Sequence, residues 1–108
     1  MPRFIAKVIL QDVNNEEIYN ELNQEMADED GYPYITGANE KIFLLPPDEY
    51  EFDLDVSATE LLNIVKLVCS KIEKKHNLKK SPIVIVEVKD IQFTNLEELT
   101  DDDFETLN

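Results

Sequence analysis

The stretch YPYITGANEKIFLLPPDEYEFDLD, residues 32–55, lies between two predicted helices, and the strands it forms decide the fold. YPYIT and KIFLL are separated by GANE, and a four-residue link with Gly and Asn predicts a β-hairpin. Pro33 has no backbone N–H to donate, so the first of these strands is expected at a sheet edge. Residues 42–45 are all apolar, which predicts a central strand that Pro46 and Pro47 then end.

The last part of this stretch, DEYEFDLD (48–55), alternates acidic and apolar residues and is expected to form an extension or an extra edge strand. One face of it would carry four carboxylates, those of Glu49, Glu51, Asp53 and Asp55. We interpret them first as a solvated edge, because charges at a sheet edge oppose the addition of further strands. The alternative is a docking face for a basic partner. Same-face carboxylates about 6.6–6.8 Å apart could imitate the phosphates of a nucleic acid.

The other elements are predicted from apolar periodicity and helix-capping residues. They are a strand at 3–11, a helix opened by Asn14 and Glu17, a helix at about 58–76 opened by Ser57 and Glu60, and a β-branched strand at 83–88. This order predicts an α+β, ferredoxin-like split βαβ fold (βαββαβ), with a four-stranded antiparallel sheet and two helices on one face. The outer face of the first strand is half apolar, so we expect the tail or a second subunit to cover the open face of the sheet.

The composition indicates one globular domain with an unusual charge. The chain has 108 residues, 43% of them hydrophobic, and a net charge of −14. We divide it into a domain at 1–90 and an acidic C-terminal tail at 91–108, partly docked or flexible. The apolar runs are too short to span a membrane and the N-terminus has no apolar segment of signal-peptide length, so we expect a cytoplasmic protein without a membrane partner. The single cysteine, Cys69, is expected to be a buried, inert thiol.

Basic side chains gather between residues 66 and 80, which makes this segment the one candidate surface for phosphate. The candidate nucleic-acid-binding residues are Arg3, Lys71, Lys74, Lys75, Lys79 and Lys80. The alternative is a solvated helix face, or pairing of these lysines with the acidic tail. His76, the only histidine, is expected at the exposed end of a helix, where it would interact well with the helix dipole. If RNA binds, His76 is the natural general base for a 2′-hydroxyl.

The opening MPRFIAKVIL and the run ITGANEKIFLLPPDEY resemble the GhoS-type antitoxins, a family of small bacterial proteins, over roughly residues 1–90. The resemblance implies a ferredoxin-like fold and a sequence-selective endoribonuclease that destroys the messenger of a membrane toxin. In nucleases of similar fold, an aspartate at the end of the first strand helps to bind a divalent metal between two subunits. The matching position here is Asp12, so the resemblance implies a Mg²⁺ or Mn²⁺ site completed in a homodimer. Asp12 is equally typical of a turn that ends a strand.

Two hypotheses of function therefore stand. The first is a metal-assisted RNA endonuclease that acts as a dimer, with Asp12 and His76 as catalytic candidates. The second is a non-enzymatic acidic protein that binds a basic partner, because a strongly negative chain repels nucleic acid and attracts cationic proteins.

Overall fold

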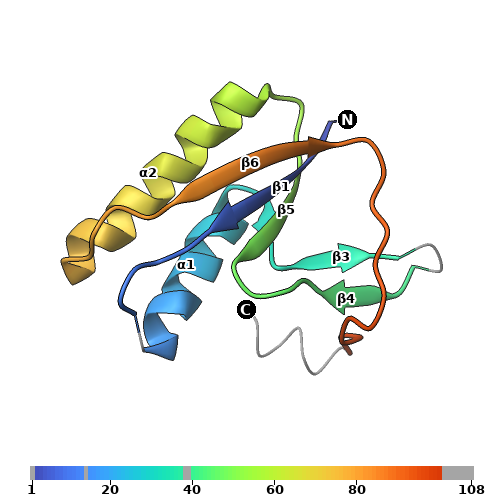
Figure 1. Ribbon diagram of the computed structural model, residues 1–108, viewed down its shortest axis with the longest axis horizontal. Helices are drawn as coiled ribbons and strands as arrows, with labels where there is room; N and C mark the ends of the chain where they lie inside the picture. The colour runs from blue at the N-terminus through green and yellow to red at the C-terminus, as the bar shows by residue number, and fades with distance from the viewer. Residues whose placement is uncertain (1, 14, 38–39, 101–108) are drawn as a thin grey trace.

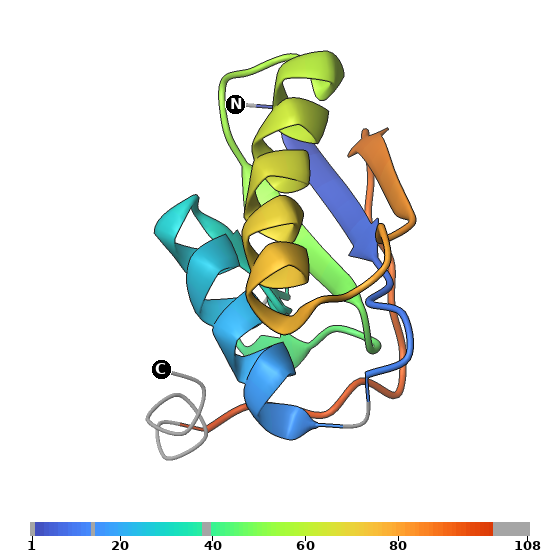
Figure 2. The same ribbon diagram turned by 90° about the vertical axis from the view of Figure 1, so that its left-hand side faces the viewer.

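The computed structural model describes residues 2–13, 15–37 and 40–100, and Figure 1 shows its helices and strands. Along the chain they are β1 (Arg3–Val8), α1 (Glu16–Asp28), β2 (Gly31–Tyr32), β3 (Tyr34–Thr36), β4 (Ile42–Leu44), β5 (Glu49–Asp53), α2 (Ala58–His76) and β6 (Ile83–Val88). Four strands form one antiparallel sheet in the order β2-β5-β1-β6, while β3 and β4 form a separate two-stranded sheet. Both helices lie on the same face of the larger sheet (Figure 2). The predicted α+β class, with a four-stranded antiparallel sheet and two helices, is confirmed, and the layout is compatible with a ferredoxin-like arrangement.

The core lies between the larger sheet and the helices, because alternate side chains of the two central strands point toward α1 and α2. The strand residues of the core are Phe4, Ala6, Val8, Tyr50 and Phe52. The helix residues packed against them include Leu22, Met26, Leu61, Val65 and Ile72. Burying a large apolar side chain contributes about 1.5–3 kcal/mol, so this single layer provides the main stabilisation of the fold.

The interpretation of residues 48–55 as an edge segment is wrong. Residues 49–53 form β5, a central strand that pairs with β1 on one side and with β2 on the other. Tyr50 and Phe52 supply the buried face, and the acidic residues between them point to the opposite, open face of the sheet. Conversely, Ile42–Leu44, expected to be central, are half-buried in the small sheet. The central position in the larger sheet is therefore taken by the segment that buries two large aromatic residues, and not by the continuously apolar segment at 42–44.

Capping side chains define where both helices begin. The side chain of Asn15 caps α1 and accepts a hydrogen bond from the backbone N–H of Glu17 at 2.9 Å, while Asn14, the predicted cap, lies outside the described residues. The capping box predicted for α2 is confirmed, since Ser57 Oγ accepts from Glu60 N at 3.1 Å and Glu60 Oε1 accepts from Ser57 N at 3.3 Å. Asn77 ends α2 in the left-handed region, with φ 55°.

The first part of the C-terminal tail docks against the small sheet and leaves the open face of the larger sheet uncovered. The backbone N–H of Leu44 donates to the carbonyl of Glu97 at 2.8 Å, and that of Leu99 donates to Ile42 at 2.8 Å. The rings of Phe43 and Phe93 meet with centroids 5.2 Å apart. The tail acids in the described part of the chain thus lie beside β4 rather than beside the lysines of α2, and the acids at 101–105 lie outside it.

Candidate functional site

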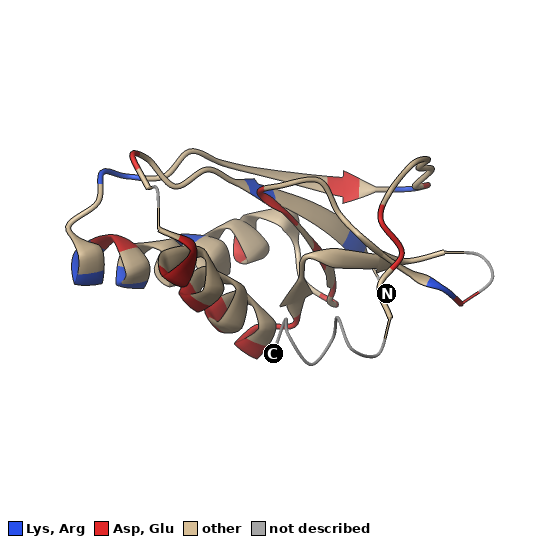
Figure 3. Cartoon of the chain, turned by 90° about the horizontal axis from the view of Figure 1, so that it is seen from below, with Lys and Arg blue, Asp and Glu red and all other residues tan. Residues whose placement is uncertain are grey.

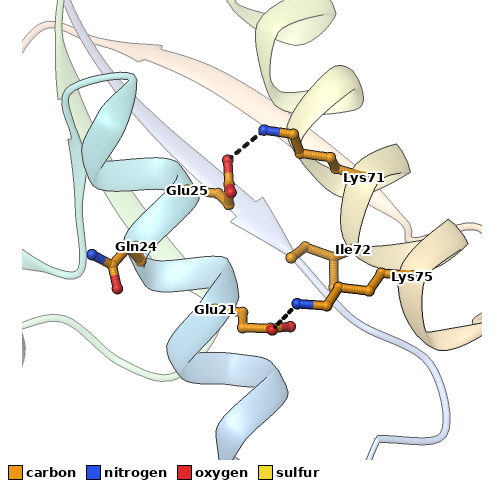
Figure 4. Close-up of a pocket in the computed structure, with 6 residues that line it drawn as sticks. All are labelled: Glu21, Gln24, Glu25, Lys71, Ile72 and Lys75. Atoms are coloured by element: carbon orange, nitrogen blue, oxygen red, sulfur yellow. Dashed lines mark hydrogen bonds and ion pairs between the residues drawn. The ribbon is translucent and has the colours of Figure 1, made fainter.

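Two ion pairs join the predicted lysine-rich surface to α1. Lys71 Nζ lies 3.0 Å from Glu25 Oε2, and Lys75 Nζ lies 2.5 Å from Glu21 Oε1. Glu21 and Glu25 are four residues apart on α1, and Lys71 and Lys75 are four residues apart on α2, so each set lies on one face of its helix. The two ion pairs therefore lie side by side between the helices. Figure 4 shows the dashed contacts crossing between the helices, on either side of Ile72. A shallow cavity of about 280 Å³ lies between these side chains.

His76 belongs to the same cluster, because its Nε2 lies 2.5 Å from Glu21 Oε2. Hydrogen bonds from Lys75 and His76 hold the pKa of the Glu21 carboxyl below its usual value. Glu21 therefore stays ionised at neutral pH, and its carboxylate is the hydrogen-bond partner of His76 Nε2. This contact explains the half-buried position of His76, which the sequence placed at an exposed helix end.

The other predicted lysines and the predicted metal residue, Asp12, lie around the same end of the molecule, whereas Arg3 lies at the opposite end of β1. Lys74, Lys79 and Lys80 are exposed, and Figure 3 shows basic segments at the C-terminal end of α2 beside the acidic segments of α1. Asp12 is exposed in the turn after β1, with φ 56°. Gln11 Nε2 donates to the Lys80 carbonyl at 3.2 Å, which holds this turn against the lysine-bearing loop.

The structure does not assemble a metal site from these residues. Asp12 makes no hydrogen bond or ion pair with another described side chain. Across residues 2–13, 15–37 and 40–100, no three His, Cys, Asp or Glu side chains gather closely enough to hold a metal ion. A role for Asp12 in binding Mg²⁺ or Mn²⁺ would therefore need ligands from outside this arrangement.

The carboxylates of β5 form a row on the open face of the sheet, beside two cations of β1. The register places Arg3 opposite Asp53 and Lys7 opposite Glu49. Arg3 Nε also lies 3.4 Å from Glu51 Oε2, without the geometry of a hydrogen bond. Arg3 is thus engaged by the β5 carboxylates rather than free to contact phosphate.

Burial and charge act in opposite directions on the middle carboxylate of this row. Burial raises the pKa of Glu51, and the positive charge of Arg3 partly offsets that rise. Asp55, the last predicted member of the row, lies beyond the end of β5 and is exposed. The row and its two ends remain acidic, because five carboxylates in and beside β5 outnumber the two cations of β1. The carboxylates are those of Asp48, Glu49, Glu51, Asp53 and Asp55, and the cations are Arg3 and Lys7.

A pocket that the sequence did not reveal opens at the start of β5. Its volume is about 420 Å³, and apolar side chains form most of its wall. It is lined by Tyr19, Asn23, Pro33, Leu44, Leu45, Pro46, Pro47, Asp48, Glu49 and Tyr50. Tyr50 donates its hydroxyl to Asn23 Oδ1, and burial raises the pKa of that phenol. The only sequence signal was the segment LPPDEY, which carries six of the lining residues but no catalytic pattern.

The structure bears on two expectations from composition, the burial of Cys69 and the lack of a membrane-spanning segment. Cys69 is buried, as predicted, and burial raises the pKa of its thiol to about 12, which disfavours the reactive thiolate. Within the part of the chain that the structure describes, neither helix has the length and apolar character needed to cross a membrane.

Comparisons with models of known protein families, with curated proteins and with solved structures gave no match.

Proposed function

We propose that this protein is a non-enzymatic acidic interaction protein that binds a basic protein segment along β5. The observation that carries the proposal is the carboxylate row of β5, which lies on the open face of a central strand with Glu51 half-buried in its middle, and whose first member, Glu49, also lines the apolar pocket together with Asp48. Same-face side chains of any extended chain repeat at about 6.6–6.8 Å, so an extended partner with alternate basic residues matches the row in spacing as well as in charge. The pocket offers room for an apolar side chain of that partner.

The state of the other cations supports this proposal over nucleic-acid binding. Three of the six predicted phosphate-binding side chains, Arg3, Lys71 and Lys75, are in ion pairs with carboxylates of the same chain. A phosphate would have to displace those carboxylates and would meet a net charge of −14. A cationic partner meets the opposite situation, because it gains from the same field.

The test uses a fluorescein-labelled peptide of alternating lysine and leucine, with binding followed by fluorescence anisotropy. The variant Glu49→Gln, Glu51→Gln, Asp53→Asn removes three charges from β5. The control Asp28→Asn, Glu29→Gln, Asp30→Asn removes three exposed charges at the end of α1. We expect the β5 variant to lose about tenfold or more in affinity and the control about threefold or less, since screened, distant charges contribute weakly.

Equal losses in the two variants would show that net charge alone attracts the peptide, and no binding by the natural chain at low salt would overturn the proposal. A peptide of alternating glutamate and leucine serves as the second control, and it should not bind.

A GhoS-like, metal-assisted endoribonuclease is the second candidate, and one contact favours it. The hydrogen bond from Gln11 to Lys80 brings the turn that carries Asp12 next to the loop of Lys79 and Lys80. Under this proposal, purified protein cleaves RNA with Mg²⁺ or Mn²⁺ and Asp12→Ala abolishes cleavage, whereas metal-independent cleavage lost in His76→Ala would place the chemistry at the end of α2. Absence of both cleavage and RNA binding at low salt would exclude this candidate for the RNAs used.

A further inference from the structure

The two edges of the larger sheet differ in how they are protected. At one edge, β2 has only two residues and is followed by Pro33. At the other edge, β6 has six residues, IVIVEV, and pairs only with β1. An edge of this length and apolar character invites pairing with another strand. Among the described residues, no other strand lies against it.

Apolar side chains extend from β6 onto the open face of the sheet. Val84 and Val86 are 56% and 48% exposed, and Ile9, just beyond the neighbouring β1, is 41% exposed. The docked part of the tail does not cover them, because residues 97–99 bind to β4. The exposed valines therefore lie on the strand whose outer edge is unpaired, and Figure 1 shows this strand, β6, at the edge of the sheet.

The hydrogen bonds between β1 and β6 show which backbone groups remain available. Ile9 N donates to the Pro82 carbonyl at 3.1 Å, in the same register that pairs Ile5 with Val86. Bonded and non-bonded pairs alternate along an antiparallel ladder, so Val84, Val86 and Val88 direct their N–H and C=O groups toward β1. The corresponding groups of Ile83, Ile85 and Glu87 point outward from the sheet.

We propose that β6 pairs with β6 of a second copy of this chain, in antiparallel orientation, to form a continuous eight-stranded sheet. The charges at the two ends of β6 favour a second copy of this chain as the partner and an antiparallel orientation of the two strands. Lys79 and Lys80 precede β6, while Glu87 lies near its end and Asp90 follows it, with Lys89 between them. Antiparallel pairing brings the basic entry of each copy to the more acidic exit of the other, whereas parallel pairing would bring like charges together. A two-fold axis at the centre of the strand satisfies both ends at once.

The outward-pointing residues also define the register. Centring the two-fold axis on Ile85 pairs Ile83 with Glu87 of the second copy through backbone hydrogen bonds. Val84 then faces Val86 of the second copy on the open face, and the segments that carry Lys80 and Asp90 meet at each end. The β5 row stays accessible in this dimer, so the proposal is independent of the proposed partner-binding function.

Sedimentation equilibrium across the micromolar range tests the association. Glu87→Pro removes an outward N–H and leaves the bonds to β1 intact, while Glu87→Thr removes the same charge and keeps the N–H. We expect the natural chain and Glu87→Thr to dimerise, and Glu87→Pro to remain monomeric with an unchanged circular dichroism spectrum. Added salt should strengthen the dimer, because it screens repulsion between two chains of charge −14. A monomer at every concentration, or a dimer unaffected by Glu87→Pro, would overturn the proposal.

Disulfide trapping tests the register independently of the proline variant. In the double variant Val84→Cys, Val86→Cys, each new cysteine faces the other type across the two-fold axis, at a separation suited to a disulfide. The natural Cys69 is buried and does not compete. We expect the double variant to form a covalent dimer faster than either single variant. Faster trapping of one single variant, or none at all, would contradict the Ile85-centred register.

Discussion

The close approach of β2 to β5 depends on the absence of a side chain at Gly31. A Cβ there would lie 2.2 Å from Cζ of Phe52, whose ring is fully buried. We therefore expect Gly31→Ala to destabilise the fold by about 1–3 kcal/mol, as overpacking does in other cores. The midpoint of urea unfolding, followed by circular dichroism, measures this loss. Adding Phe52→Leu should make the double variant less destabilised than the sum of the single variants, and strict additivity would contradict the proposed clash.

The buried hydroxyl of Tyr50 is expected to affect stability in two ways. Its hydrogen bond to Asn23 is lost in Tyr50→Phe, which should cost about 0.5–1.5 kcal/mol at neutral pH. Burial also raises the pKa of Tyr50 above the usual value of 10.0, so the folded state holds this proton more tightly than the unfolded chain does. The corresponding stability is fully present below pH 10.0 and is lost as pH rises beyond it.

Thermal unfolding at neutral and at strongly alkaline pH separates the two effects. The Tm of Tyr50→Phe should lie below that of the natural chain at neutral pH but fall less steeply at alkaline pH. A residual slope is expected in the variant, because burial also raises the pKa of Tyr19 and Tyr34. Parallel slopes in the two proteins would show that Tyr50 is not protected from ionisation by the fold.

At the scale of elements, α1 carries charges that oppose its own dipole. Its last turn has no basic residue, and the acidic run Asp28, Glu29 and Asp30 lies at its C-terminal end. Asp30 also adopts φ 67°, a conformation that glycine enters more easily. We expect Asp30→Gly to stabilise the protein by about 0.5–1 kcal/mol through relief of the backbone and removal of the charge.

Asp30→Asn is the matched control for this helix end, because it removes the charge and keeps a similar side chain. The free energy of unfolding of Asp30→Asn should rise by the electrostatic contribution alone, about 0.3–1 kcal/mol at low salt, and this increase should be smaller in high salt. Urea unfolding at two salt concentrations measures both variants. Destabilisation by Asp30→Gly would show that the Asp30 side chain makes a contribution that outweighs these costs.

The sequence predicted which segments form regular structure better than it predicted how the strands pair. Both helices and the strands at either end followed from local periodicity and capping residues, which act over a few positions. The position of β5 did not, because a strand with three acidic residues is central only if its other face stays open. The central position of β5 also depends on Gly31, which lets β2 pack closely against Phe52, and on Arg3, which lies beside the β5 carboxylates. Both residues are distant from β5 in the sequence. The same limit applied to the site, since the pair Lys71–Glu25 and the contact Tyr50–Asn23 join separate elements.

At the scale of the whole molecule, acids outnumber cations by 24 to 10, and several of the cations are already paired with carboxylates of the same chain. Arg3, Lys41, Lys71 and Lys75 are all ion-paired with carboxylates. The excess acids therefore define the outward field of the protein, and that field favours basic partners over nucleic acid. Self-association through β6 must overcome the same field, which is why the two proposed interactions should respond to salt in opposite directions.

The docked tail is expected to stabilise the small sheet of β3 and β4 and not the larger sheet. Ending the chain after Asp90 removes Phe93 and the backbone bonds from residues 97–99 to β4, but no core residue of the larger sheet. We expect the shortened chain to unfold cooperatively, with faster amide hydrogen exchange confined to β3 and β4, because local stability follows local contacts. The single change Phe93→Ser should produce a weaker form of the same pattern. Faster exchange throughout β1 and β5 would show instead that the tail stabilises the whole fold, and residues 1–90 could not then be regarded as an independent domain.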